Sequence, residues 1–201
     1  MPTTAPYGSW KSPITTDLIV SGSIGLGDVA LDYEDIYWVE MRPAEGGRMV
    51  VVKRTPTGKI KDVTPGPFSA RTKVHEYGGG AYLVHEGTVY FSNYSDQRMY
   101  RQELGGEPRP ITPEVDMRYA DGCYDAGRNR VICVREDHTR GGEPVNAIVA
   151  VDALGHAEQV ILTQGSDFCS TPRISPEGTT LAWLTWDHPN MPWDGTFLLT
   201  A

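Results

Sequence analysis

Short runs of apolar and β-branched residues alternate with polar breaks along the whole chain. Apolar positions with the spacing of an amphipathic helix are hard to find over any window of about ten or more residues. The 22 Gly and 15 Pro interrupt the chain at short intervals, as they do between the strands of β proteins. This pattern predicts an all-β fold.

The strand-like runs recur in sets of four. The first three sets comprise residues 29–31, 36–39, 49–54 and 60–64, then 80–84, 88–91, 98–104 and 109–112, then 122–125, 130–134, 147–152 and 159–163. A fourth set follows at residues 172–175, 179–185 and 196–200. Aligned on Ile36, Val89, Val131 and Leu181, the second strands recur at intervals close to the roughly 40–50 residues of a four-stranded propeller blade. We therefore predict a β-propeller. A β-sandwich would also give many short strands, but it does not explain the even length of the sets.

The fourth set reaches Ala201 with three strands, so the prediction is a partial β-propeller of about three and three-quarter four-stranded blades. A closed four-bladed ring would require residues 14–20 to supply the missing strand. Otherwise residues 1–201 are the N-terminal part of a larger propeller, and this is the arrangement that we expect.

Composition narrows the possible partners. The formal net charge is −8 and the basic residues are scattered, which argues against a nucleic-acid partner. The three Cys, at 123, 133 and 169, form no CxxC and suggest reduced, partly buried thiols. No signal peptide or membrane-spanning run is apparent, so we expect a soluble, cytoplasmic protein without a membrane partner.

The predicted topology gathers the more elaborate loops on one face. In an antiparallel blade, the loop after the second strand and the crossover into the next blade emerge on the same side, because the chain reverses at each strand. We name this side the loop-rich face and expect it to serve in substrate gating or domain docking, although polar loops can also be simply solvated. The candidate residues are His75, Glu76, Tyr77, Arg118, Asp137, His138, Trp186, Asp187, His188, Trp193 and Asp194.

Three features of this face allow local predictions. His75 beside Glu76, and His138 beside Asp137, could transfer protons, but we favour a structural hydrogen bond between each His and its neighbouring carboxylate. Residues 78–80 are three glycines, which we expect to let the backbone pass tightly into a strand. Residues 186–195 (WDHPNMPWDG) form a loop between two strand-like runs, whose Trp and Pro rings should pack on each other.

Motifs that would place a complete active site in this chain are not found. Residues 21–25 approach the G-x-S-x-G of a hydrolase, but the first position is Ser and no helix follows. Acidic pairs such as Asp121 with Asp125, or Asp187 with Asp194, lack the dense spacing of a calcium loop. We therefore predict no catalytic residue, no metal site and no cofactor.

Four segments together resemble a known family. Residues 6–14 (PYGSWKSPI), 75–80 (HEYGGG), 133–138 (CVREDH) and 186–195 are similar, in this order, to the propeller of the acylaminoacyl-peptidase-like branch of the prolyl oligopeptidase family of serine peptidases. In that family a β-propeller precedes an α/β-hydrolase domain, which carries the Ser, Asp and His of catalysis. The resemblance implies that this chain is the propeller fragment, that the catalytic domain lies outside it, and that the chain alone is inactive.

The partners implied by the resemblance are the remainder of the propeller, an α/β-hydrolase domain and a peptide substrate. Two other functions fit the predicted fold. One is a non-enzymatic scaffold that binds a protein through the loop-rich face, and the other is a propeller hydrolase of sugars or lactones with a central metal ion.

Overall fold

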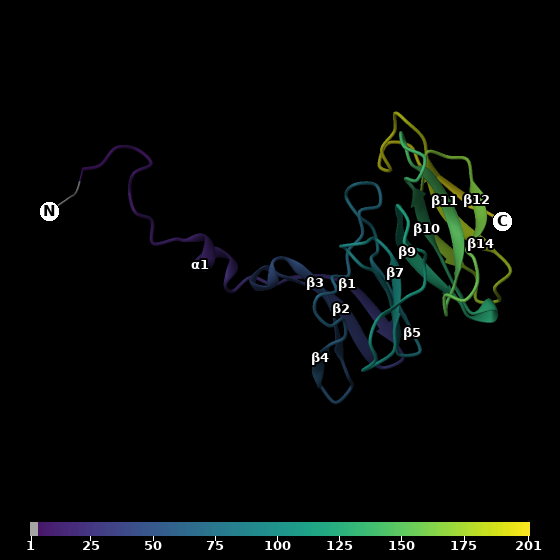
Figure 1. Ribbon diagram of the computed structural model, residues 1–201, viewed down its shortest axis with the longest axis horizontal. Coiled ribbons are helices and arrows are strands. Elements are labelled where there is room, and N and C mark those ends of the chain that lie inside the picture. Colours follow the sequence, from purple (N-terminus) through teal and green to yellow (C-terminus); the bar gives the residue numbers. More distant parts are fainter. Residues whose placement is uncertain (1–3) are drawn as a thin grey trace.

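The computed structural model describes residues 4–201, and β-strands dominate them. The strands form four antiparallel sheets, which we call blades one to four (Figure 1). Blade one contains β1 (Gly25–Asp32), β2 (Asp35–Arg42), β3 (Arg48–Arg54) and β4 (Ile60–Asp62). Blade two contains β5 (Tyr82–His85), β6 (Thr88–Ser92), β7 (Met99–Gln102) and β8 (Arg109–Pro110). Blade three contains β9 (Met117–Asp125), β10 (Arg130–Asp137), β11 (Val145–Asp152) and β12 (Val160–Gln164). Blade four contains β13 (Phe168–Ile174), β14 (Leu181–Trp186) and β15 (Phe197–Thr200).

Helices are few and short in the described residues. They are α1 (Thr16–Val20) and two single turns of 3-10 helix, η1 (Pro43–Glu45) and η2 (Ala126–Arg128). No described helix is long and apolar enough to cross a bilayer. The three Cys are free thiols, as expected, with Cys133 and Cys169 buried.

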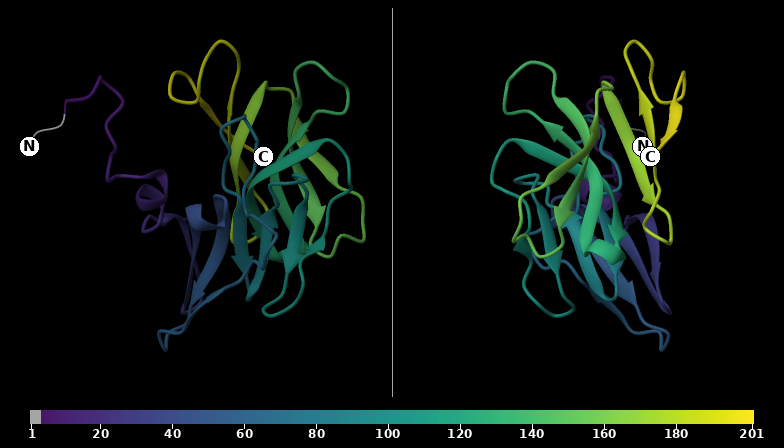
Figure 2. Two further views of the ribbon diagram at one scale, coloured as in Figure 1. Left: turned by 60° about the vertical axis from the view of Figure 1, so that its left-hand side comes forward. Right: turned by 90° about the vertical axis from the view of Figure 1, so that its right-hand side faces the viewer.

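Strand order within every blade follows the chain, so each strand pairs with its neighbours in sequence. Three blades have four strands and the fourth has three, which confirms the prediction of an all-β, partial propeller of three and three-quarter blades. Both views of Figure 2 show the blades side by side, with the loop of residues 187–196 and the loop of residues 138–144 at the same end of the molecule.

Each blade–blade interface has its own apolar core. The strands in the middle of the molecule are apolar on both sides: in β10, Val131 and Cys133 pack toward blade two, while Ile132 and Val134 pack toward blade four. The first interface is filled by Tyr37, Val39, Val51, Val89, Phe91 and Tyr100. The second is filled by Tyr90, Met99, Ile111, Tyr119, Val131, Cys133 and Val149, and the third by Val74, Ile132, Val134, Ile148, Cys169, Leu181 and Trp183. Continuous burial of this kind explains why several strands are uniformly apolar.

The two ends of the row of blades leave apolar side chains uncovered. In β1, Leu26, Val29 and Leu31 are 71–73% exposed, and in β15, Phe197 and Leu198 are 65% and 68% exposed. A strand that is apolar and yet exposed normally has a partner. The row of four blades, which we call the arc, is therefore open at both of its ends.

Two segments that the sequence pattern places between sets of strands are instead parts of strands. Residues 116–121 lie almost wholly in β9, and residues 166–170 lie partly in β13. In both strands a β-bulge lies at a residue with positive φ, Asp121 (56°) or Thr171 (52°), and pairing resumes after it with a shifted register. Because a bulge inserts an extra residue without ending the strand, the sequence pattern breaks where the strand does not.

The missing outer strand of blade four is not supplied by residues 14–20. This segment contains α1, which Thr15 caps by accepting a hydrogen bond from the backbone N of Leu18 at 3.1 Å. A Thr cap of this kind favours helix initiation, and the helix extends away from the sheets in Figure 1. The closed four-bladed ring is therefore wrong for this chain.

Candidate functional site

The loop-rich face contains a cavity of about 320 Å³ between blades three and four and the crossover that leads into blade two. Its lining residues come from five separate segments of the chain, and they are His75, Glu76, Tyr77, Glu136, Glu143, Pro144, Phe168, Trp186 and Met191. The prediction that crossovers and the loops after second strands meet on one side is confirmed by this assembly. The volume is within the range of small-molecule sites.

A buried carboxylate, Glu136, organises the floor of the cavity. It is 2% exposed at the end of β10. Its Oε1 accepts a hydrogen bond from the backbone N of His75 at 2.6 Å, and its Oε2 lies 3.2 Å from Nε2 of His138. The Nη1 atom of Arg118 lies 3.8 Å from the same Oε2. One side chain thus joins the crossover, β9 and the loop after β10.

The expected pairing of each His with the carboxylate next to it in sequence is therefore wrong. His138 contacts Glu136 and not Asp137, whose Oδ1 accepts hydrogen bonds from the backbone N and the hydroxyl of Thr139. Glu76 does not pair with His75. The error has a physical reason: neighbours in a strand point to opposite faces, so His138 and Glu136, two apart, share a side. Glu136 could have been found by this rule, since it continues the buried face of Ile132 and Val134.

Glu76 is paired instead with Arg118. The Nη1 atom of Arg118 donates to Oε1 of Glu76 at 2.6 Å and to the carbonyl of Lys73 at 2.9 Å. The hydrogen bond from Arg118 lowers the pKa of the Glu76 carboxyl. Arg118 thereby joins the start of β9 to the crossover. The carboxylate of Glu76 balances the positive charge of Arg118.

His75 and Glu76 have left-handed backbone conformations, with φ of 55° and 64°. Such values are uncommon for residues other than Gly and persist where the surroundings enforce them, here through the hydrogen bond to Glu136. Burial lowers the pKa of the His75 ring, although Glu136 and Asp121 oppose the shift. Within residues 4–201, its Nε2 atom is buried and has no hydrogen-bond partner.

Aromatic rings form the wall of the cavity. The centroid of His75 lies 5.2 Å from Trp186, 5.7 Å from Phe168 and 5.6 Å from Tyr77. Phe168 and Trp186 stack with centroids 5.4 Å apart. Phe168 was not among the predicted residues, because it lies between the predicted strand runs 159–163 and 172–175.

The loop of residues 186–195 is shaped by polar contacts, and only one of its Trp residues is packed. Trp186 is 3% exposed, whereas Trp193 is 74% exposed, so the expected packing of Trp193 within the tip is wrong. Asp167 accepts from the backbone N of His188 at 2.9 Å and lies 3.0 Å from its Nδ1. Asp187 accepts from the backbone N of Asp167 at 2.7 Å, and Asp194 accepts from the backbone N of Met191 at 3.0 Å.

The predicted site residues therefore divide into two groups. Around the cavity the structure brings together His75, Glu76, Tyr77, Arg118, His138 and Trp186. The lining does not include Asp137, Asp187, His188, Trp193 and Asp194. The three Asp and His188 form polar contacts with their own loops, with Arg135 or with Asp167, and the His188 ring also lies 4.8 Å from that of Phe168. The second group shapes loops around the cavity.

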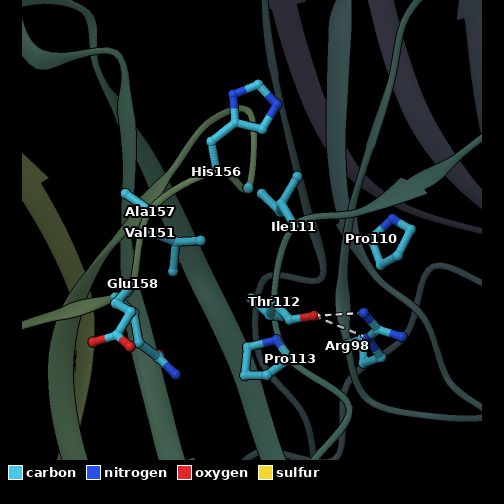
Figure 3. Close-up of a pocket in the computed structure, with 11 residues that line it drawn as sticks. Arg98, Pro110, Ile111, Thr112, Pro113, Val151, His156, Ala157 and Glu158 are labelled. Carbon is cyan, nitrogen blue, oxygen red and sulfur yellow. Dashed lines mark hydrogen bonds between the residues drawn. The ribbon is translucent and has the colours of Figure 1, made fainter.

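A larger cavity, of about 620 Å³, lies away from this face, between the segment that follows β8 and the turn between β11 and β12 (Figure 3). Arg98 donates from Nε and Nη2 to the carbonyl of Thr112, at 2.9 and 2.7 Å. Gly155 approaches Ile111 so closely that a Cβ there would lie 2.8 Å from its Cα. The labelled side chains of His156 and Glu158 point in different directions in Figure 3 and do not converge on one point. We therefore place the candidate site on the loop-rich face.

Neither a metal site nor a catalytic triad is visible in residues 4–201. No three His, Cys, Asp or Glu side chains in this range lie together as metal ligands. Asp121 accepts from the backbone N of Gly80 and of Thr171, while Asp125 pairs with Arg130 at 2.8 Å. Asp121 thus has donors on both carboxylate oxygens, and Asp125 has them on Oδ2.

Comparison with known proteins identifies solved structures that are similar to this chain. No protein-family model and no curated protein matches it. Among solved structures, a puromycin hydrolase is 35% identical, with a TM-score of 0.87, over 100% of this chain and 33% of its own. A puromycin-hydrolyzing peptidase of Mycobacterium tuberculosis is 37% identical, with a TM-score of 0.85, over 100% of this chain and 33% of its own. TolB from Acinetobacter baumannii, at 16% identity and a TM-score of 0.61, shares the fold alone.

The chain spans about a third of the length of the two hydrolases. The matched third is their propeller part, and the four sheets of this chain align with it along their whole length. Along its whole length the chain is therefore similar to the propeller part of members of the prolyl oligopeptidase family, as the four segments of its sequence indicate.

Proposed function

We propose that this chain acts in substrate gating and domain docking within a serine peptidase of the acylaminoacyl-peptidase or dipeptidyl-aminopeptidase type. Identity of 35–37% over the whole chain to two puromycin-hydrolysing enzymes carries the proposal. The substrate class that follows is a small peptide or an aminoacyl amide, and the reaction is hydrolysis of its amide bond.

The exposed ends of the arc support a role within a larger assembly. Leu26, Leu31 and Leu198 are each more than two-thirds exposed on strands that would be internal in a closed propeller. In the proposed peptidase, further blades cover these faces. An independent scaffold would have to keep them in water, so we favour the peptidase.

The loop-rich face is the surface proposed to meet the hydrolase domain and the substrate. Its cavity is lined mainly by aromatic and apolar side chains with a few polar groups, as in most small-molecule sites. Within residues 4–201, the His side chains that form hydrogen bonds pair with Glu136 and Asp167 and with no Ser. Chemistry is accordingly assigned to the hydrolase domain.

The first test uses the chain alone. Incubation with puromycin and with acyl-peptide and aminoacyl chromogenic substrates should give no turnover, and a fluorophosphonate probe should label no Ser. Labelling of a Ser in this chain would contradict the assignment of catalysis to another domain.

The second test uses a chimera in which this chain replaces the matching third of the Mycobacterium tuberculosis peptidase. We expect the chimera to hydrolyse aminoacyl substrates, with a selectivity that differs from that of the parent. A chimera that folds but has the parent's kcat/KM for every substrate would argue against gating by this face.

A further inference from the structure

A cavity of about 460 Å³, which we call the Arg135 cavity, lies across β10 from the cavity of about 320 Å³. Its lining comes from the ends of β10 and β12, the loop after β10, the start of β11 and residues 165–167. Neighbours in a strand point to opposite faces, so Glu136 lines the cavity of about 320 Å³ while Arg135 and Asp137 line the other. Among the described residues, only Pro144 lines both. The two cavities are therefore separate sites.

The guanidinium group of Arg135 is buried in the wall of this cavity without a close partner. The residue is 6% exposed. Within residues 4–201, its Nε atom is buried and has no hydrogen-bond partner. Its Nη2 atom lies 3.8 Å from Oδ2 of Asp137, which is longer than a hydrogen bond. A buried charge is costly unless it is paired and hydrogen-bonded, so an anion at close range would stabilise Arg135.

The carboxylates that line the cavity have donors of their own. The Oδ1 atom of Asp137 accepts from the backbone N of Thr139 at 3.0 Å and from its hydroxyl at 2.6 Å. The Oδ2 atom of Asp167 lies 3.0 Å from Nδ1 of His188. These contacts hold both carboxylates within their loops, and neither forms a hydrogen bond with Arg135. A close counter-charge for Arg135 must therefore come from a ligand.

The lining selects among anions. Two carboxylates line the cavity, so a dianion such as a phosphate ester is repelled more strongly than a monoanion. Pro144, Val145 and Ile161 add apolar surface, and the volume is larger than a bare inorganic ion needs. A carboxylate presents two oxygens that match the planar fork of a guanidinium group. The best fit is a carboxylate that carries an apolar chain.

We propose that the Arg135 cavity binds a small aliphatic monocarboxylate. Its oxygens accept from Arg135, its chain packs against Val145 and Ile161, and Arg140 adds a second positive charge from the loop after β10. The site is independent of the proposed function, because it is separate from the cavity of about 320 Å³ and its occupation needs no hydrolase domain.

The test is calorimetric titration of the 201-residue chain with pentanoate, pentanamide and butyl phosphate. The three probes share a four-carbon chain and carry one, no and about two negative charges at pH 7. We expect pentanoate to bind at least about tenfold more tightly than pentanamide, and more tightly than butyl phosphate, because one charge pair forms at a largely buried site. Equal affinity for pentanoate and pentanamide, tighter binding of butyl phosphate, or no binding of pentanoate would each overturn the proposal.

Two variants in the buried wall locate the site. Arg135→Lys keeps the charge but removes the planar fork, and it should weaken pentanoate about threefold to tenfold. Asp137→Asn keeps the shape and removes a negative charge, so it should strengthen butyl phosphate about threefold and pentanoate less. Arg54→Gln, exposed on β3 in blade one, is the control and should change neither. An unchanged affinity in Arg135→Lys, or an equal loss in Arg54→Gln, would show that the acid binds elsewhere.

Arg140→Gln tests the cavity without altering its buried wall. Because Arg140 is exposed on the loop after β10, the variant should keep the urea midpoint of the wild type and weaken pentanoate about twofold to threefold. This variant and Asp137→Asn decide the question if Arg135→Lys fails to fold. Wild-type affinities for pentanoate and butyl phosphate in both would overturn the proposal.

Discussion

At the scale of single residues, the loop-rich face depends on Glu136 and His75. Glu136 holds the backbone of His75 in its left-handed conformation, and His75 in turn packs against Trp186. A buried carboxylate that loses its donors is strongly destabilising, and so is a backbone N–H that loses its acceptor. The cavity is thus preorganised by contacts within the chain.

The His75 ring predicts a pH dependence of stability. Burial lowers its pKa in the folded chain, so below about pH 6.5 the unfolded chain binds the proton more readily and the free energy of unfolding decreases. We expect urea midpoints to fall between about pH 7 and about pH 5, and the fall to be smaller in His75→Asn, which tolerates a positive φ. His156→Gln, on an exposed turn, is the control and should keep the wild-type slope. A slope in His75→Asn equal to that of the wild type would contradict this account.

The two Trp residues of the loop predict unequal losses of stability. Trp186→Ala should lower the free energy of unfolding by about 3–5 kcal/mol, since it removes a buried ring stacked on Phe168. Trp193→Ala should change it by less than about 0.5 kcal/mol, because the ring is 74% exposed. Urea unfolding followed by circular dichroism measures both. Similar losses in the two variants would mean that Trp193 is packed in solution.

At the scale of elements, the blades are joined through the bulges of their first strands. The Oδ1 atom of Asp121 accepts from the backbone N of Gly80 at 2.6 Å, and its Oδ2 accepts from the backbone N of Thr171 at 3.0 Å. One carboxylate in blade three therefore contacts blades two and four. A Cβ on Gly79 would lie 2.9 Å from this Oδ1, which confirms that the glycines permit a tight passage.

Removal of this link should weaken the whole row of blades. Asp121→Ala loses two hydrogen bonds to a charged acceptor, and we expect the free energy of unfolding to fall by about 3 kcal/mol. Asp121→Asn keeps one acceptor oxygen and should lose about half as much. Asp116→Asn, exposed just before β9, is the control. Chemical denaturation gives the three values, and a loss in Asp121→Ala no larger than in the control would contradict the role assigned to Asp121.

The strands themselves could be predicted from the sequence, because alternation and turn residues are local signals. Every predicted set corresponds to a blade. The bulges could not be predicted, since the left-handed Asp121 and Thr171 are held by partners from other blades. For this reason the strands β9 and β13 begin earlier than their sequence pattern indicates.

At the scale of the molecule, the candidate face could be predicted but not its contacts. Topology alone places crossovers and the loops after second strands together, and His75, Tyr77 and Trp186 do meet. The partners of His138 and Glu76 depend on side-chain direction and on residues far apart in the chain, Glu136 and Arg118. Neighbours in sequence are a poor guide to such pairs.

The open ends of the arc predict self-association of the isolated chain. Leu26 and Leu31 are 73% and 71% exposed on β1, and apolar strands left in water associate. Light scattering after size-exclusion chromatography should show oligomers, and Leu26→Lys with Leu31→Lys should shift the mass toward the monomer. Leu154→Lys, 45% exposed on a distant turn, should leave the mass unchanged. A strictly monomeric wild-type chain would contradict this prediction.

The most direct test of the central claim, that the loop-rich face docks the substrate of a peptidase, is the KM for puromycin of the chimera carrying Tyr77→Ala. Tyr77 lines the cavity and is 62% exposed, so its ring can contact a ligand without supporting the core. We predict a KM raised about threefold to tenfold, as expected for the loss of one aromatic contact, with kcat little changed. Leu104→Ala, 49% exposed in the turn between β7 and β8, should leave KM as it is. An unchanged KM in Tyr77→Ala, in a chimera that hydrolyses puromycin, would contradict the claim.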